Sequence, residues 1–150
     1  MKSIRIYVLE VLGPVVQNLR KVVLSLLGYK NISKRAVIER GVRLDRVYPQ
    51  HIYIGDDTLV AGSVTILCHE HVYRDPVDRR LPLLKKVHIG KRCFIGVSAV
   101  ILPGVTIGDD CIIGAGAIVS KDIPAGSLAV GVPARVVRSN IKLNDRAIAE

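Results

Sequence analysis

The sequence predicts an all-β protein, a parallel β-helix of about four triangular coils, preceded by an amphipathic helix. One observation behind this prediction is a six-residue period of branched aliphatic residues that runs without a slip from position 89 to position 119. The other is the composition, which is 49% apolar but only 4% aromatic. A core of Val, Ile, Leu and Ala suits short, closely layered strands. Internal repetition of this kind predicts the architecture more directly than the secondary-structure propensities of single residues do.

The repeating unit is an aliphatic residue, usually followed by Gly, with a small or apolar residue four positions after the aliphatic. Its aliphatic members are Ile89, Ile95, Ile101, Ile107, Ile113 and Val119. The small residue and the next aliphatic are two apart, so both point to the interior side of one strand. We interpret the glycine as a corner where positive φ costs little. Three strands and three corners close a coil, and coils stacked about 4.8 Å apart share hydrogen bonds.

The same register recurs upstream in two shorter blocks. It is clear at Ile54, Val60 and Ile66, and fainter at Ile32, Ile38 and Leu44. Blocks of three, three and six units make four turns of 18 residues. We therefore assign residues 31–138 to the β-helix domain, 1–30 to an N-terminal helical segment and 139–150 to a C-terminal tail.

The N-terminal segment contains the helix. The stretch PVVQNLRKVVLSLLG has an amphipathic pattern, with Pro14 at its first position and Gly28 at its end. We expect this helix to pack on the β-helix or its oligomer. A membrane-surface helix is the alternative, because Arg20, Lys21 and Lys30 add positive charge to the segment.

Two irregularities separate the blocks of the repeat. The stretch YPQH, at 48–51, contains a proline and lengthens one corner. The second is larger, a loop over residues 72–86 that begins directly after His71. Loops that interrupt a regular solenoid are where binding and catalytic residues gather, so we expect the functional site beside this loop.

Charge and cysteine content indicate which partners and which cellular compartment to expect. A net charge of +9 favours anionic partners, such as phosphate-bearing cofactors. Three cysteines, an odd number without a CxxC pair, favour free thiols in a reducing compartment. Cys93 and Cys111 stand at equivalent interior positions, so we expect them to stack in adjacent coils. No apolar run is long enough to span a membrane and no cleavage site follows the N-terminus, which predicts a cytoplasmic protein, membrane-peripheral if the helix binds lipid.

Two of the four histidines, His69 and His71, stand where the repeat stops. Their spacing of two puts both imidazoles on the outward face of one strand. A histidine can be neutral near pH 7 and can therefore serve as a general base. Glu70 falls where the repeat requires a small interior residue, so the coil is expected to depart from regularity there.

The stretch VHIGKRCFIGVSAVILPGVTIGDDCIIGAGAIVSKDIPAGSLAVGVPARVVR, at 87–138, resembles the hexapeptide-repeat acetyltransferases, in particular the galactoside and maltose O-acetyltransferases and their polysaccharide-modifying relatives. The resemblance implies a left-handed coil and a homotrimer that binds acetyl-CoA between neighbouring subunits. It implies direct transfer of acetyl to a hydroxyl of a sugar or polysaccharide precursor. His71 aligns with the family's catalytic histidine, and His69 falls two residues earlier.

The resemblance also implies contacts for the donor and the acceptor. The backbone N–H groups of Val97 and Ala115 match positions at the pantetheine arm or thioester, and Phe94 matches an aromatic beside that arm. The positions that match contacts to the nucleotide end are Ser120, Lys121, Arg135 and Arg138. The imidazole of His71 needs an orienting hydrogen-bond acceptor, for which Glu70, beside the acceptor site, or a backbone carbonyl is a candidate. Asp45 is a candidate to face the acceptor.

Several alternatives remain at this point. An amine of an amino sugar or sugar nucleotide could accept the acetyl group in place of a hydroxyl. Cys68, beside His69, could act as a covalent nucleophile. No metal site is expected, because His51 and His88 lack the spacing of the three-histidine zinc site found in carbonic anhydrases of this fold. A non-catalytic β-helix that serves as a scaffold is a further alternative. The loop and the basic C-terminal residues argue against it, because a scaffold needs neither. Nucleic-acid binding rests on net charge alone and is not expected.

Overall fold

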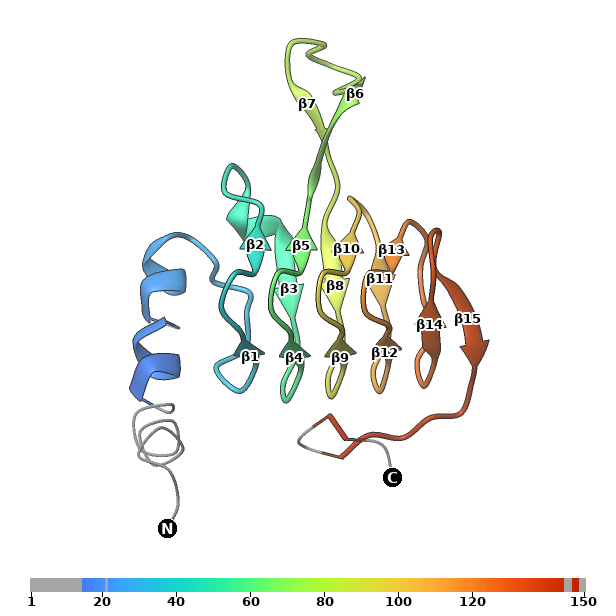
Figure 1. The fold of residues 1–150 in the computed structure, drawn as a ribbon. Coiled ribbons are helices and arrows are strands. Elements are labelled where there is room, and N and C mark those ends of the chain that lie inside the picture. Colours follow the sequence, from blue (N-terminus) through green and yellow to red (C-terminus); the bar gives the residue numbers. More distant parts are fainter. Residues whose placement is uncertain (1–14, 21, 145–146, 149–150) are drawn as a thin grey trace.

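The computed structural model describes residues 15–20, 22–144 and 147–148. Within these residues the backbone winds as a coil of short strands, from a helix at one end to two longer strands at the other (Figure 1). The strands of successive turns pair in parallel, which confirms the predicted parallel β-helix.

The strands of the coil itself form three stacked faces. The first contains β1 (Val37–Ile38), β4 (Leu59–Val60), β9 (Phe94–Ile95), β12 (Ile112–Ile113) and β14 (Leu128–Val130), and β15 (Arg135–Arg138) joins β14 in antiparallel orientation. The second contains β2 (Arg43–Leu44), β5 (Thr65–Ile66), β10 (Val100–Ile101) and β13 (Ile118–Val119). The third contains β3 (Ile52–Ile54), β8 (Val87–Ile89) and β11 (Thr106–Ile107).

The core is the column of repeat aliphatics that this register creates. Leu44, Ile66, Ile101 and Val119 stand directly over one another on the second face. All are buried, as are the other predicted aliphatics except Ile32, which is half-buried. Cys93 and Cys111 are buried free thiols in neighbouring coils, as expected.

The repeat glycines do not serve the purpose that we expected. Gly96, like the glycines at 55, 90, 108 and 114, does not have positive φ. Positive φ occurs instead three residues after the aliphatic, at Ser98, Gly104 and Gly116 among others. A Cβ at Gly96 would lie 2.6 Å from the backbone nitrogen of Ala115 in the next coil. Glycine is therefore required because the next coil passes too close for a side chain.

The N-terminal helix covers residues 15–20 and 22–26 in the described part of the chain. It ends as predicted at Gly28, where φ is 95° and the N–H of Tyr29 bonds the carbonyl of Leu24 at 3.0 Å. Leu24 packs against the core, whereas Leu19 and Leu26 are exposed. The predicted start at Pro14 lies outside the described residues. None of the described helices is long and apolar enough to cross a membrane.

Both irregularities of the repeat have defined structures. The YPQH corner contains the short 3-10 helix η1 (Pro49–His51). The larger interruption is an antiparallel hairpin of β6 (His69–Arg74) and β7 (Pro82–Leu84), which projects from the coil (Figure 1). The hairpin lies where the protruding loop was expected, at 72–86, but its first strand begins earlier, at His69, so both histidines belong to that strand.

The C-terminal tail folds back onto the coil. The N–H of Ile141 bonds the carbonyl of Gly126 at 2.8 Å, and the N–H of Leu143 bonds a carboxylate oxygen of Asp110 at 3.3 Å. Leu143 is buried as a result. These contacts hold the described part of the tail against the corners of the last coils.

Replacing Gly96 with Ala is expected to destabilise the fold by about 1–3 kcal/mol, because the new Cβ meets backbone atoms that cannot rotate away. Chemical denaturation followed by circular dichroism measures this change. Gly116→Ala is the matched control, since a Cβ there has no neighbour within 4 Å and only the positive φ opposes it. A smaller loss for Gly96→Ala than for Gly116→Ala would contradict the close-approach explanation.

Candidate active site

The candidate site lies where the chain leaves the second face of the coil and enters the hairpin. His69 and His71 both stand at the start of β6. Their ring centroids are 4.8 Å apart with the ring planes at 87°, an edge-to-face contact. This contact confirms that the two imidazoles share one side of the strand.

Asp45 lies directly after β2, in the coil beneath the histidines. Its N–H bonds the carbonyl of Ile66 at 2.9 Å, which continues the pairing of β2 with β5. The carboxylate is fully buried, and its Oδ2 atom forms a short hydrogen bond with Nδ1 of His69. The expectation that Asp45 faces the acceptor is therefore not met, because its side chain points into the protein and is occupied by His69.

Backbone groups complete the surroundings of this carboxylate. Oδ1 accepts hydrogen bonds from the N–H groups of Val47 and Tyr48, at 3.0 and 3.3 Å, and Oδ2 accepts one from Cys68 at 3.0 Å. Burial by itself would raise the pKa of Asp45, but the hydrogen bonds from Cys68, His69 and Val47 outweigh it and lower the pKa below its ordinary value. Asp45 is therefore an ionised acceptor at neutral pH.

The ring of His69 is also held from the side. Tyr48 packs edge to face against it, with centroids 5.8 Å apart, and stacks on His51 at 6.1 Å. Because His71 packs on His69 as well, rotation of the His69 ring is restricted. Sequence reasoning missed the contribution of Tyr48, although its place in the irregular YPQH corner was a signal that it lies near the site.

His71 and Glu70 have different surroundings from His69. His71 is exposed and makes no hydrogen bond to another described residue. The carboxylate of Glu70 accepts the N–H of Val72 at 2.8 Å, so it caps the start of the hairpin. The coil departs from regularity here, as predicted, but Glu70 is not the partner that orients an imidazole.

Cys68 is a buried interior residue. Burial, together with the hydrogen bond and the negative charge of Asp45, raises the pKa of its thiol to about 12. The thiol lies 3.2 Å from the carbonyl oxygen of Tyr48, to which it donates. A protonated, buried thiol is a poor nucleophile, which argues against a covalent cysteine mechanism.

The expected acetyl-CoA contacts lie farther along the coil. Val97 and Ala115 occupy equivalent corners of adjacent coils, joined by a hydrogen bond from the Gly116 N–H to the Val97 carbonyl at 2.9 Å. Within the described residues, the N–H groups of Val97 and Ala115 donate no backbone hydrogen bond. Phe94 is half-buried on β9. These positions therefore present a half-buried aromatic and two free donors.

The remaining contacts lie near the C-terminal end of the coil. They are all exposed: Ser120, Lys121, Arg135 and Arg138. Ser120 and Lys121 follow β13, and the two arginines begin and end β15. In the described part of the chain, Lys121, Arg135 and Arg138 have no carboxylate partner within salt-bridge distance. They are available to phosphate groups, which suits the nucleotide end of acetyl-CoA.

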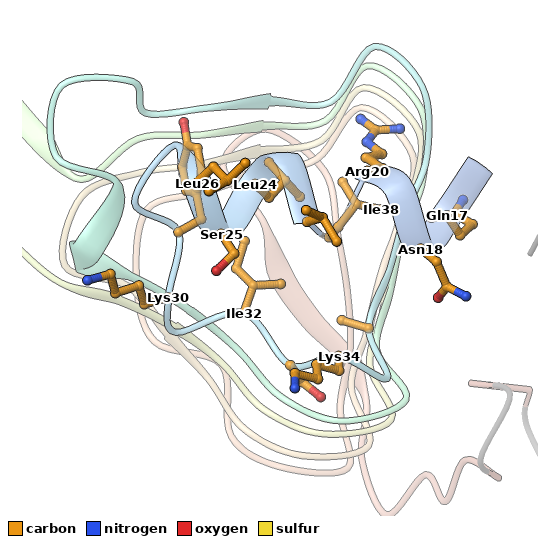
Figure 2. A pocket seen from close by; sticks show the side chains of 14 residues that line it. Gln17, Asn18, Arg20, Leu24, Ser25, Leu26, Lys30, Ile32, Lys34 and Ile38 are labelled. Carbon is orange, nitrogen blue, oxygen red and sulfur yellow. The ribbon is translucent and has the colours of Figure 1, made fainter. Parts of the chain in front are cut away.

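A cavity of about 460 Å³ lies elsewhere, between the N-terminal helix and the first coil. Figure 2 shows its lining, which includes Leu24, Ile32 and Ile38. None of the candidate site residues lines it. The chemistry of the histidines and the carboxylate, not the size of this cavity, therefore locates the candidate active site.

Comparisons with known proteins support both the six-residue repeat and the coiled fold. A model of the hexapeptide repeat of succinyl-transferase matches residues 86–121. The galactoside O-acetyltransferase of Escherichia coli (strain K12) is 43% identical over 96 residues, which are 63% of this chain and 46% of that protein. The chain spans between 45% and 63% of the length of four curated relatives that it matches.

Two solved structures extend the comparison to the fold. A hexapeptide-repeat-containing acetyltransferase of Vibrio cholerae O1 biovar eltor, solved with acetyl coenzyme A, is 32% identical, with 73% of this chain and 61% of that chain covered and a TM-score of 0.64. A maltose O-acetyltransferase of Clostridium difficile 630 is 31% identical, with 80% and 74% covered and a TM-score of 0.62. These neighbours imply that the coil is a left-handed β-helix. The chain belongs to the hexapeptide-repeat acetyltransferase family.

Proposed function

We propose that this protein is an acetyl-CoA-dependent O-acetyltransferase that modifies a hydroxyl group of a sugar or polysaccharide precursor. The observation that carries the proposal is the pair of adjacent imidazoles, His69 and His71, one of them bonded to a buried carboxylate. Relatives named as galactoside and maltose O-acetyltransferases support a carbohydrate acceptor.

The site supports direct transfer. A neutral imidazole of the pair accepts the proton of the acceptor hydroxyl while the oxygen forms a bond with the thioester carbonyl carbon. The carbon–sulfur bond then breaks, and the proton passes from the imidazole to the departing thiolate. Alignment with the family favours His71 as this base. General-base assistance contributes about 10² to 10⁴ in rate.

The acyl donor is proposed to lie along the corners that lead from the hairpin to the C-terminal strands. The N–H groups of Val97 and Ala115 would bind carbonyl oxygens of the pantetheine arm or the thioester. Phe94 would flank that arm. The cations at the end of the coil, Lys121 and the two arginines of β15, would bind the phosphates.

We also propose a homotrimer with active sites between subunits. The hairpin exposes apolar side chains, with Val72 82%, Tyr73 67% and Val77 94% exposed. A neighbouring subunit would cover this surface and close a pocket over the histidines, which the single chain leaves open on that side.

Replacing both histidines, His69→Ala with His71→Ala, is expected to lower turnover by at least about 10², because no base remains. Thiol release from acetyl-CoA in the presence of sugars, sugar nucleotides and polysaccharide fragments measures the reaction. Light scattering of the variant provides the control that a trimer still forms. Unchanged thiol release from a trimeric double variant would refute the proposed mechanism.

Cys68→Ala is expected to keep turnover within about twofold, since the buried thiol is protonated and does not react. A modest loss of stability, about 1 kcal/mol, follows from the small cavity that it leaves. Steady-state kinetics and thermal unfolding measure the two effects. Loss of all activity in a folded variant would revive the cysteine mechanism.

Lys121→Ala is expected to raise KM for acetyl-CoA about tenfold with little change in kcat, because a phosphate contact is made equally in the ground and transition states. Lys34→Ala, at an exposed lysine beside the N-terminal cavity, is the matched control. If Lys121→Ala, Lys34→Ala and the wild type had the same KM for acetyl-CoA, Lys121 would not be part of the donor site.

A further inference from the structure

The N-terminal helix presents most of its apolar side chains to solvent. Four of them recur at intervals of four, three and four residues and therefore form one stripe along the helix: Val15, Leu19, Val22 and Leu26. Their exposed fractions are 61%, 65%, 56% and 82%. The half-buried side chains of the described helix are instead Gln17, Arg20 and Leu24. A helix that served only to cover the first coil would turn its apolar stripe toward the core.

The same end of the chain carries an unbalanced positive charge. Residues 15–40 contain six Lys or Arg and one Glu, so they contribute +5 to the net charge of +9. Among the described cations of this segment, Arg35 is paired with Asp57 at 2.6 Å. The others have no carboxylate of the described residues within salt-bridge distance: Arg20, Lys30, Lys34 and Arg40. Burial and the positive charge of Arg40 both lower the pKa of Arg20, so like charges face each other here.

The cavity beneath the helix brings the apolar and the cationic groups together. Its apolar lining includes Leu24, Ile32 and Ile38. In the view of Figure 2, Lys30 and Arg20 lie on opposite sides of Leu24 and Ile32. An apolar centre bordered by cations suits an amphiphile with apolar chains and an anionic headgroup.

Charge distinguishes the groups that could cover this surface. An exposed apolar patch with a polar border marks a contact with a protein or a membrane. A second copy of the same end would add another +5, and residues 1–14 have a net charge of +1 in the sequence, so neither would neutralise the cations. Anionic lipid headgroups would neutralise them, and each Lys or Arg near such a surface raises the affinity about fivefold.

We infer that the N-terminal end of the coil binds the anionic surface of a lipid bilayer. The helix lies in the plane of the membrane interface with its apolar stripe among the acyl chains, and Lys30 and Lys34 contact lipid phosphates. The strand β15 is at the opposite end of the coil and therefore points away from the bilayer (Figure 1). The inference concerns where the protein binds and does not rest on the proposed acetyl transfer.

Flotation of the full chain with lipid vesicles tests the inference. We expect binding to vesicles that contain equal amounts of phosphatidylglycerol and phosphatidylcholine, and at least about tenfold weaker binding to phosphatidylcholine alone. Raising the salt concentration from about 0.1 M to about 1 M should weaken the binding to the anionic vesicles, because salt screens the charges. Absence of binding to the anionic vesicles would overturn the inference.

Two double variants separate the apolar from the charged contribution. Leu19→Gln with Leu26→Gln should weaken binding to the anionic vesicles at least about tenfold, because both side chains leave water in the bound state. Lys30→Gln with Lys34→Gln should weaken it about 25-fold, which is about fivefold for each charge. Circular dichroism and light scattering show whether the variants keep the fold and the oligomeric state of the wild type.

The matched controls lie at the other end of the coil. Val137, on β15, is 60% exposed, so Val137→Gln makes a comparable apolar-to-polar change there. Lys121→Gln with Arg138→Gln removes two charges beyond the reach of the bound surface, and binding should change by less than about twofold. If a control lost as much binding as the matching variant of the N-terminal end, the vesicles would not bind through the helix and the inference would be wrong.

Tryptophan fluorescence locates the contact, because the chain contains no Trp. Leu26→Trp adds one fluorophore to the apolar stripe, and Val137→Trp adds one at the opposite end. The anionic vesicles should shift the emission of Leu26→Trp to shorter wavelength and leave that of Val137→Trp unchanged. An emission of Leu26→Trp that is already at short wavelength without vesicles, and that vesicles do not change, would show that protein covers the stripe and would refute membrane binding.

Discussion

The structure depends on the register in which successive coils stack. On the second face Leu44 lies beneath Ile66, which in turn lies beneath Ile101, so each aliphatic side chain continues one interior column. The same pairing continues for one more residue, where the Asp45 N–H bonds the Ile66 carbonyl. Because a shift of one residue would turn every side chain to the other side of the strand, the packing of the core and the approach of Asp45 to His69 are set by one constraint.

This constraint explains how the coil accommodates a carboxylate in its interior. A buried ionised carboxylate without partners is costly. Asp45 avoids that cost because the corner after β2 turns two N–H groups toward it and the chain leaving β5 supplies a third. The residue that holds His69 therefore also stabilises the point where the repeat gives way to the hairpin.

The sequence predicted the coil and the face shared by the histidines, because both follow from strict periods of six and two. It did not predict the partner of His69. That contact joins residues 24 apart and depends on the path of the irregular corner at 46–51. The register did contain a signal, since the residue after Leu44 must lie near the residues after Ile66. The purpose of the glycines was misjudged because a position in a repeat does not distinguish a need for positive φ from a need for space.

The hairpin and the coil contribute differently to the site. Asp45, Tyr48 and the start of β6 are tied to the coil by backbone hydrogen bonds and ring packing, whereas the hairpin beyond His71 is exposed. A group that must hold a fixed geometry is better placed on the rigid part. The asymmetry between His69 and His71 follows from this division, since the boundary between coil and hairpin passes between them.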